Sequence, residues 1–140
     1  MTAWVLDSSM ALAWALPDEK SAEAERFMAQ AAQDSRAALW VPALWWYEIA
    51  NALTSARRRK RLSEADAARL IELYGQLPLQ TDASLGGEAM WRHQALAVEH
   101  GLSAYDAAYL ELAQRTGAGL ASLDERLSAA ARQAGLTSFA

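Results

Sequence analysis

The chain has 140 residues, of which 53% are apolar and 21% charged, and this composition excludes a disordered chain and fits one folded domain over residues 1–140. It has no cysteine, which excludes disulfides, zinc–thiolate sites and cysteine nucleophiles. The net charge of −4 is atypical of a protein that binds nucleic acid over its whole surface.

The apolar segments predict neither an export signal nor a membrane span. The stretch 10–16 has no basic residue ahead of it, and the longest uncharged apolar stretch, 37–47, has only 11 residues. A membrane helix needs about 20 such residues. Because the absence of cysteine also suits a reducing compartment, we expect a cytoplasmic protein that does not enter a membrane.

Short apolar segments that suit buried strands alternate along the chain with amphipathic segments that suit helices. The strands are predicted at 4–6, 38–41, 77–81, 119–122 and 137–139. The helices are predicted at 10–16, 21–35, 44–59, 63–74, 84–100, 103–115 and 124–134. This alternation is typical of an α/β fold, in which a parallel sheet carries helices on both faces.

Acidic residues recur where one edge of this sheet is expected. All strands of a parallel sheet end at the same edge, and ligands bind there at the point where the strand order reverses. Asp7 directly follows the first predicted strand, Asp124 follows the fourth and begins a helix, and Glu48 lies in the second turn of the helix after the second strand. Asp7, its neighbour Ser8 and Asp124 could instead serve only as helix caps. A helical wheel leaves Glu48 open between a site residue and an ordinary solvent-facing glutamate.

Asp106 stands in the first turn of a later helix. Ser103-x-x-Asp106 has the form of a capping box, which is the structural alternative. On a helical wheel, however, Asp106 falls in the apolar arc with Tyr105 and Tyr109, whereas Glu111 falls in the polar arc. A carboxylate on the core side costs several kcal/mol unless a metal ion or helix-terminal N–H groups compensate its charge.

Several other polar residues are expected to be structural. Ser63-x-x-Asp66 is an equally good capping box, but it follows a helix rather than a strand. Asp82 follows a strand that is expected at the edge of the sheet, where it would be a turn or cap residue. His93 and His100 lie within a helix and at its end, so we expect them on the surface and outside the site.

The four acids, Asp7, Glu48, Asp106 and Asp124, indicate a metal site. Carboxylates that are brought together raise one another's pKa values unless a cation joins them. Oxygen ligands suit Mg²⁺ or Mn²⁺, and these ions hold phosphate oxygens, generate hydroxide and stabilise a leaving oxygen. The sequence contains neither a Gly-rich phosphate loop nor a Gly-x-Ser-x-Gly motif, either of which would indicate another chemistry. The pattern therefore predicts phosphodiester hydrolysis.

A basic run ends the helix that carries Glu48 and holds five of the 13 basic residues: Arg57, Arg58, Arg59, Lys60 and Arg61. This run could be a solvated cluster that suits the carboxyl end of the helix dipole. Alternatively it could contact the phosphate backbone of RNA. At 1.5 Å per helical residue the start of the run lies ~14 Å from Glu48, within reach of adjoining nucleotides.

Four short motifs occur in order along nearly the whole chain: Val5-Leu6-Asp7-Ser8-Ser9, Glu48-x-x-Asn51, Ser103-x-x-Asp106-Ala107-x-Tyr109 and Ser122-Leu123-Asp124-x-x-Leu127. Together they resemble the PIN-domain ribonucleases, and among these the VapC-type toxins of bacterial toxin–antitoxin pairs. Ser122 departs from the threonine that is more frequent at its position, but it keeps a hydroxyl.

The resemblance implies a five-stranded parallel sheet, in the order 3-2-1-4-5, between helices. It implies an endoribonuclease whose Mg²⁺ or Mn²⁺ is bound by the first three of the four acids, with Asp124 completing the cluster directly or through water. It also implies that Ser8, Asn51 and Ser122 orient these acids. The resemblance further implies a homodimer, as is usual in the family, and a cognate antitoxin that blocks the toxin by inserting into the active-site groove.

Three other functions stay open as alternatives. A receiver-like phosphorylation switch would need paired acids after the first strand and a late lysine, but Asp7 is followed by serines and no lysine follows Lys60. A phosphatase with an Asp-x-Asp nucleophile would need an acid where Ser9 stands. A PIN-fold module that binds a partner without catalysis would have no metal affinity.

Overall fold

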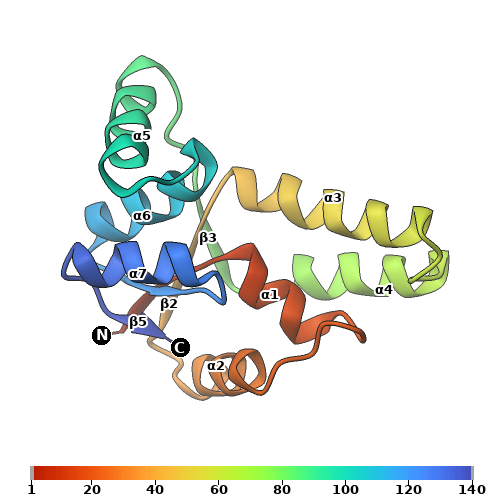
Figure 1. Ribbon diagram of the computed structural model, residues 1–140. Helices are drawn as coiled ribbons and strands as arrows, with labels where there is room; N and C mark the ends of the chain where they lie inside the picture. Colours follow the sequence, from red (N-terminus) through yellow and green to blue (C-terminus); the bar gives the residue numbers. More distant parts are fainter. Residues whose placement is uncertain (1, 140) are drawn as a thin grey trace.

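The computed structural model describes residues 2–139, which form five strands and seven helices in the predicted alternation (Figure 1). The strands are β1 (Ala3–Leu6), β2 (Ala38–Pro42), β3 (Leu79–Asp82), β4 (Gly119–Ala121) and β5 (Ser138–Phe139). The helices are α1 (Ser8–Ala15), α2 (Ala22–Gln33), α3 (Leu44–Arg58), α4 (Glu64–Gly75), α5 (Gly87–His100), α6 (Ala104–Thr116) and α7 (Glu125–Gln133). The predicted elements are confirmed, and their bounds differ from the prediction by at most three residues.

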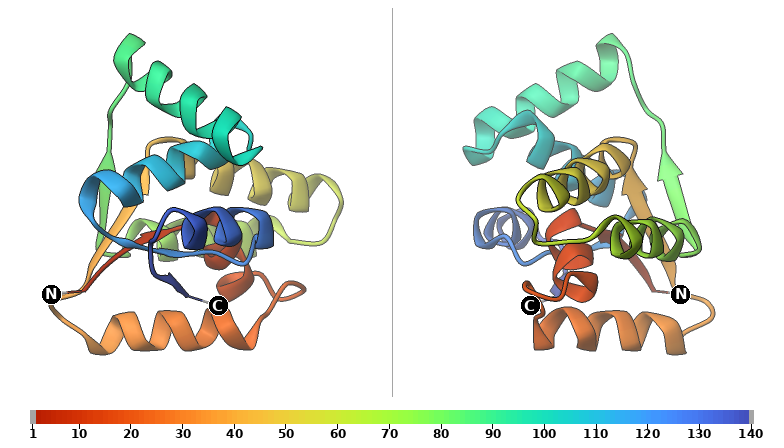
Figure 2. Two further views of the ribbon diagram at one scale, coloured as in Figure 1. Left: turned by 60° about the vertical axis from the view of Figure 1, so that its left-hand side comes forward. Right: turned by 90° about the vertical axis from the view of Figure 1, so that its right-hand side faces the viewer.

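All neighbouring strands are parallel, and their order, β3-β2-β1-β4-β5, confirms the expected one. The chain steps from β1 to β3 in one direction and then returns to β4 and β5 on the other side of β1. Because crossovers between parallel strands are right-handed, the helices before β3 and those after it lie on opposite sides of the sheet. The sheet accordingly lies between α2 on one side and α7 on the other (Figures 1 and 2). The strand order reverses between β1 and β4, where ligands are expected to bind.

The two central strands are fixed by close packing. Val5 and Leu6 of β1 pair with Leu120 and Ala121 of β4, and all four side chains are fully buried. Gly119 lets the ring of Trp4 lie against the backbone, because a Cβ atom at position 119 would come within 2.7 Å of that ring. The residues that directly follow β1 and β4 therefore meet at one edge of the sheet.

Helix α6 is the most deeply covered helix of the described part of the chain, since every residue from Ala107 to Ala113 is buried. It packs against β1, β2 and β4 and also against α5 and α7. The prediction that Glu111 faces solvent is wrong, because neighbouring helices cover that side of α6 and leave Glu111 only 4% exposed. Tyr105, predicted in the apolar arc, is instead 69% exposed, because the first turn lies at the edge of the sheet rather than over it.

Three helices extend beyond the sheet. Helices α3 and α4 pair as a long hairpin, and α5 packs chiefly on α6 (Figures 1 and 2). Within residues 2–139, no helix combines the length and the apolar character that crossing a membrane requires.

Candidate active site

Asp7 stands at the point where β1 ends. Its backbone N–H donates to the carbonyl of Ala121 at 2.9 Å, which continues the pairing of β1 with β4 by one residue. The side chain is only 5% exposed, and its Oδ2 atom accepts hydrogen bonds from the hydroxyls of Ser9 and Ser122, both at 2.6 Å. Although Asp7 occupies the N-cap position of α1, its carboxylate caps no helix N–H group. The alternative in which Asp7 is only a cap is therefore wrong.

The same two serines tie the loop after β1 to the loop after β4. Ser122 Oγ accepts a hydrogen bond from the Asp124 N–H at 3.0 Å, and Ser9 Oγ accepts one from the Leu123 N–H at 3.0 Å. The Asp124 side chain caps α7, because its Oδ1 atom accepts a hydrogen bond from the Leu127 N–H at 3.1 Å. Asp124 is thus the cap of α7. The loop between β4 and α7, to which Asp124 belongs, is tied to the two serines that hold Asp7.

Glu48 projects from the second turn of α3 toward α6. Its Oε1 atom accepts a hydrogen bond from the hydroxyl of Tyr109 at 2.5 Å. Burial is the main cause that raises the pKa of Glu48, and the charge of Asp7 raises it further, while hydrogen bonds from Tyr109 and Ser8 lower it. Glu48 is therefore not an ordinary solvent-facing glutamate.

Asp106 lies at the start of α6, where Ser103 caps the helix by accepting a hydrogen bond from the Asp106 N–H at 3.1 Å. The capping interaction is real, but it leaves the Asp106 side chain half-buried near another acid. Burial raises the pKa of Asp106 most, and the charge of Asp124 raises it further, whereas Ser103 and the more distant Arg126 lower it. Capping and a site role are compatible here, as they are for Asp124.

The four acids act on one another electrostatically. Burial raises the pKa of Asp7 most, the two serine hydrogen bonds oppose this, and the charges of Asp106 and Asp124 raise it again. None of the four acids forms an ion pair with a basic side chain in residues 2–139. Carboxylates from four separate segments therefore influence one another, and within residues 2–139 only the charge of Arg126 acts against this, on Asp106.

The chemistry of this donor set fits a hard divalent cation, which prefers carboxylate oxygens. Both serines donate to the Oδ2 atom of Asp7. The Oδ1 atom accepts no hydrogen bond from residues 2–139 and is therefore available as a ligand. Over the same residues, no group of three or more acidic or histidine side chains is close enough together to hold an ion as it stands. The carboxylates would thus have to draw closer around a cation.

Replacing Asp7 with Asn should stabilise the metal-free protein, and by more at high pH than at low pH. The folded-state pKa of Asp7 lies above its ordinary value of 3.8, so folding favours the protonated form. In the wild-type chain, the favourable contribution of protonated Asp7 to folding stability is fully present below about pH 4 and is lost as the pH rises through the folded-state pKa. Asn does not titrate, so the variant does not lose stability in this way. Urea unfolding in EDTA at about pH 4 and pH 8 measures the change, and an equal difference at both pH values would contradict it.

The basic run at the end of α3 is partly neutralised. Arg57 lies 3.8 Å from Glu64, and Arg61 pairs with Asp18 at 2.6 Å. The middle three residues of the run are exposed and form no ion pair within the described part of the chain. Only part of the run is therefore available for an external anion.

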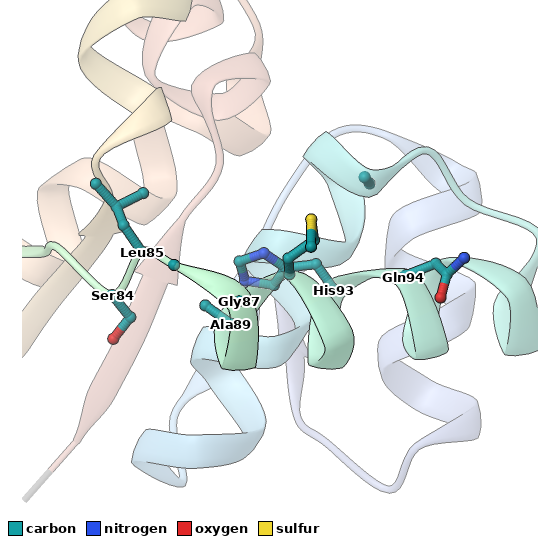
Figure 3. A pocket seen from close by; sticks show the side chains of 9 residues that line it. Ser84, Leu85, Gly87, Ala89, His93 and Gln94 are labelled. Carbon is teal, nitrogen blue, oxygen red and sulfur yellow. The ribbon is translucent and has the colours of Figure 1, made fainter.

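Two hollows lie beside the site rather than in it. One, of about 650 Å³, opens between the loop after β3 and helices α5 and α6, and is lined by residues that include Leu85 and His93 (Figure 3). A smaller one of about 260 Å³ reaches Leu44 and Tyr105. Neither is lined by any of the four acids.

Both histidines, which were expected on the surface, are partly buried. The side chain of His93 is 23% exposed and that of His100 is 9% exposed. His93 Nε2 lies 3.7 Å from the buried carboxylate of Glu111, because α5 packs on the side of α6 that carries it. Neither contact involves the four acids.

Ser63 and Asp82 were both predicted to have structural roles, as a helix cap and as a turn or cap residue. Ser63 caps α4 by accepting from the Asp66 N–H at 3.1 Å, as expected. The prediction that Asp82 follows the strand as a turn or cap residue is wrong, because it is the last residue of β3; its side chain accepts from Ser84 in the next loop and pairs with Arg115.

Two residues beside the acids carry contacts that sequence reasoning did not assign, namely Ser9 and Tyr109. Both stand inside the motifs quoted above, and a hydroxyl within a motif is the signal that could have drawn attention to them. Asn51, which was expected to orient the acids, is exposed and makes no side-chain hydrogen bond with them in residues 2–139. Its proposed role stays a prediction.

Comparison with known proteins identifies the family of the chain. The sequence model of the PIN domain matches residues 4–133. Ribonuclease VapC3 of Pyrobaculum aerophilum is 35% identical over 124 residues, which cover 89% of this chain and 91% of the relative.

Two solved structures share the fold. VapBC2 of Rickettsia felis, bound to a DNA fragment from their promoter, gives a TM-score of 0.68 at 9% identity and covers 98% of this chain and 97% of its own. Mycobacterium tuberculosis VapC20, a sarcin–ricin loop cleaving toxin, gives 0.64 at 16% identity and covers 96% of each chain. At these identities the structures establish the fold alone. The match of the PIN domain along most of the chain and the identity to VapC3 show that the chain belongs to the PIN-domain family, among its VapC-type members.

Proposed function

We propose that this protein is an endoribonuclease of the toxin class, which hydrolyses RNA phosphodiester bonds with Mg²⁺ or Mn²⁺ bound by the four acids. The observation that carries the proposal is that four carboxylates near the switch point of the sheet act on one another electrostatically and have no ion-pair partner in residues 2–139. The VapC relative, which is named a ribonuclease, supports RNA as the substrate.

In this proposal Asp7 is the central ligand, since two serines hold its Oδ2 atom and leave Oδ1 toward the cation. Glu48 and Asp106 are the further ligands, and Asp124 contributes directly or through water. When bound, the ion would hold a phosphate oxygen, activate water and stabilise the leaving oxygen. Because the pKa values of Asp7, Glu48 and Asp106 are raised, protons compete with the metal, and metal affinity should rise with pH.

The proposal is tested with purified protein and RNA in the presence of Mn²⁺ or Mg²⁺. Cleavage should require the metal and disappear on addition of EDTA. In cells, expression of the wild-type chain should arrest growth and fragment RNA, whereas the Asp106→Asn variant should do neither. A chain that binds Mn²⁺ by calorimetry but leaves RNA intact would reject the nuclease, and one that does not bind Mn²⁺ would favour the non-catalytic binding module.

The phosphate-transfer alternatives gain no support from the site. Two serine hydroxyls already engage Asp7, and Ser9 supplies a hydroxyl where an Asp-x-Asp nucleophile needs an acid. A receiver-like switch needs a lysine beside its aspartate, and neither Lys20 nor Lys60 pairs with an acid in residues 2–139. Labelling of Asp7 by an acyl phosphate would revive that alternative.

We propose that the exposed part of the basic run contacts the RNA backbone. Replacing Arg58 and Arg59 with Ala should raise KM for RNA several-fold with little change in kcat, and should reduce the slope of log affinity against log salt by about 1 to 2. The matched control is Arg61→Ala, whose guanidinium is already paired with Asp18, so its effect on KM should be smaller. Equal effects of the two changes would argue against specific contacts.

We propose that a second copy of the chain and a cognate antitoxin are the protein partners. Helix α5 exposes Met90, Trp91 and Val98, by 66%, 72% and 77%, and an apolar surface of this kind marks a protein contact. We expect a dimer that covers this surface. Sedimentation of the protein as a monomer would remove the dimer from the proposal. The antitoxin is expected to block cleavage by covering the four acids, and both proteins would act in the cytoplasm, where the RNA is.

A further inference from the structure

Tyr109 connects the interior of the protein to the proposed metal centre. Its side chain is fully buried in α6, in a stretch that is otherwise apolar except for Glu111. Its hydroxyl nevertheless has a polar partner outside α6, because it donates a hydrogen bond to Oε1 of Glu48, on α3, at 2.5 Å. Packing alone would be satisfied by a phenylalanine ring, so the hydroxyl calls for a separate explanation.

The position of Tyr109 relative to Asp106 sharpens this point. The two residues are three positions apart in α6, so their side chains lie on the same side of the helix. One turn of α6 therefore carries one of the four acids and also the group that holds another of them. The hydrogen bond fixes the orientation of Glu48, which comes from a different helix, relative to Asp106.

We propose that Tyr109 is a positioning residue for the metal centre, one that engages Oε1 of Glu48 and so presents the rest of this carboxylate to the cation. The inference rests on the proposed function, because it takes Glu48 to be a metal ligand. A charged acceptor makes the hydrogen bond a strong one, and hydrogen bonds of this kind orient metal ligands. Burial and the nearby charges of Asp7 and Glu48 raise the pKa of Tyr109, so its hydroxyl stays a donor.

The test compares two tyrosine-to-phenylalanine variants by calorimetric titration of the full chain with Mn²⁺. Y109F removes the bond to Glu48 and keeps the ring. Y74F is the matched control, because Tyr74 is equally buried and its hydroxyl donates to the carbonyl of Ala11 at 2.8 Å, which is a contact with backbone and not with an acid. We expect Y109F to weaken Mn²⁺ binding about tenfold or more and Y74F to leave it unchanged.

A double-mutant cycle separates positioning from a general structural effect. In the Glu48→Gln background, where the charged ligand is absent, adding Y109F should change the Mn²⁺ affinity by less than about twofold. Thermal unfolding of the two phenylalanine variants provides the second readout, and we expect similar Tm values because each keeps its buried ring and loses one hydrogen bond of the hydroxyl.

The possible results lead to distinct conclusions. If the wild-type chain binds Mn²⁺ and Y109F binds it equally well, the positioning role is rejected while the metal centre stands. An equal loss of affinity in Y74F, an undiminished effect of Y109F in the Glu48→Gln background, or a Y109F chain that unfolds where Y74F folds would each show a structural role instead. If the wild-type chain does not bind Mn²⁺, the metal centre itself is rejected together with this inference.

Discussion

Asp7→Asn is expected to reduce metal-dependent RNA cleavage by about a thousandfold, or ~4 kcal/mol of transition-state stabilisation. Asn keeps the size of Asp and an oxygen that can still accept from Ser9 and Ser122, so the local geometry should persist. It removes the charge that we expect to bind the cation. Because this charge is buried and lies near the other three acids, the metal-free variant should at the same time be more stable than the wild-type chain.

The combination of lost activity and gained stability distinguishes a ligand from a structural residue. A fluorescent RNA substrate measures the cleavage rate in Mn²⁺, and urea unfolding in EDTA measures the stability. Asp66→Asn is the matched control, because Asp66 lies in the first turn of α4, far along the chain from the four acids, and pairs with Arg69. Cleavage by the Asp7 variant at the rate of this control would remove Asp7 from the metal centre.

Arg115→Ala is expected to lower the free energy of unfolding by about 2–3 kcal/mol. Arg115 donates to both oxygens of Glu111 at 2.8 and 3.0 Å and to both oxygens of Asp82 at 3.0 and 2.8 Å. Without it, the nearly inaccessible carboxylate of Glu111 keeps, among residues 2–139, only the basic side chains of Arg92 and His93, each at 3.7 Å. The expected loss stays below that of a fully buried pair because Arg115 itself is 36% exposed.

Two variants make this second prediction specific. Arg132→Ala breaks an ion pair of similar length, 2.8 Å to Glu125, but both side chains are largely exposed, so a loss of no more than about 1 kcal/mol is expected. Replacing Glu111 with Leu in the Arg115→Ala background removes the uncompensated buried charge and should restore much of the lost stability. Urea denaturation measures all three, and equal effects of the Arg115 and Arg132 changes would contradict the account.

The sequence determined the local elements and their order. Apolar runs identified the strands, and serines such as Ser63 and Ser103 marked helix starts, because these signals depend on neighbours within a few residues. The alternation of strands and helices then implied a parallel sheet, and the resemblance to PIN-domain proteins supplied the strand order. Since Asp7 directly follows β1 and Asp124 lies in the short loop after β4, their arrival at one edge followed from chain order alone.

Contacts between distant segments were decided only by the tertiary structure. A helical wheel treats α6 as if one side faced water, so it could not anticipate that α5 would cover Glu111 and bring His93 against it. In the same way, nothing in the spacing of the chain indicates that the Tyr109 hydroxyl reaches Glu48, 61 positions away. The physical reason is that burial, ion pairing and hydrogen bonding depend on distances across the packed helices, whereas sequence patterns report only on one element at a time.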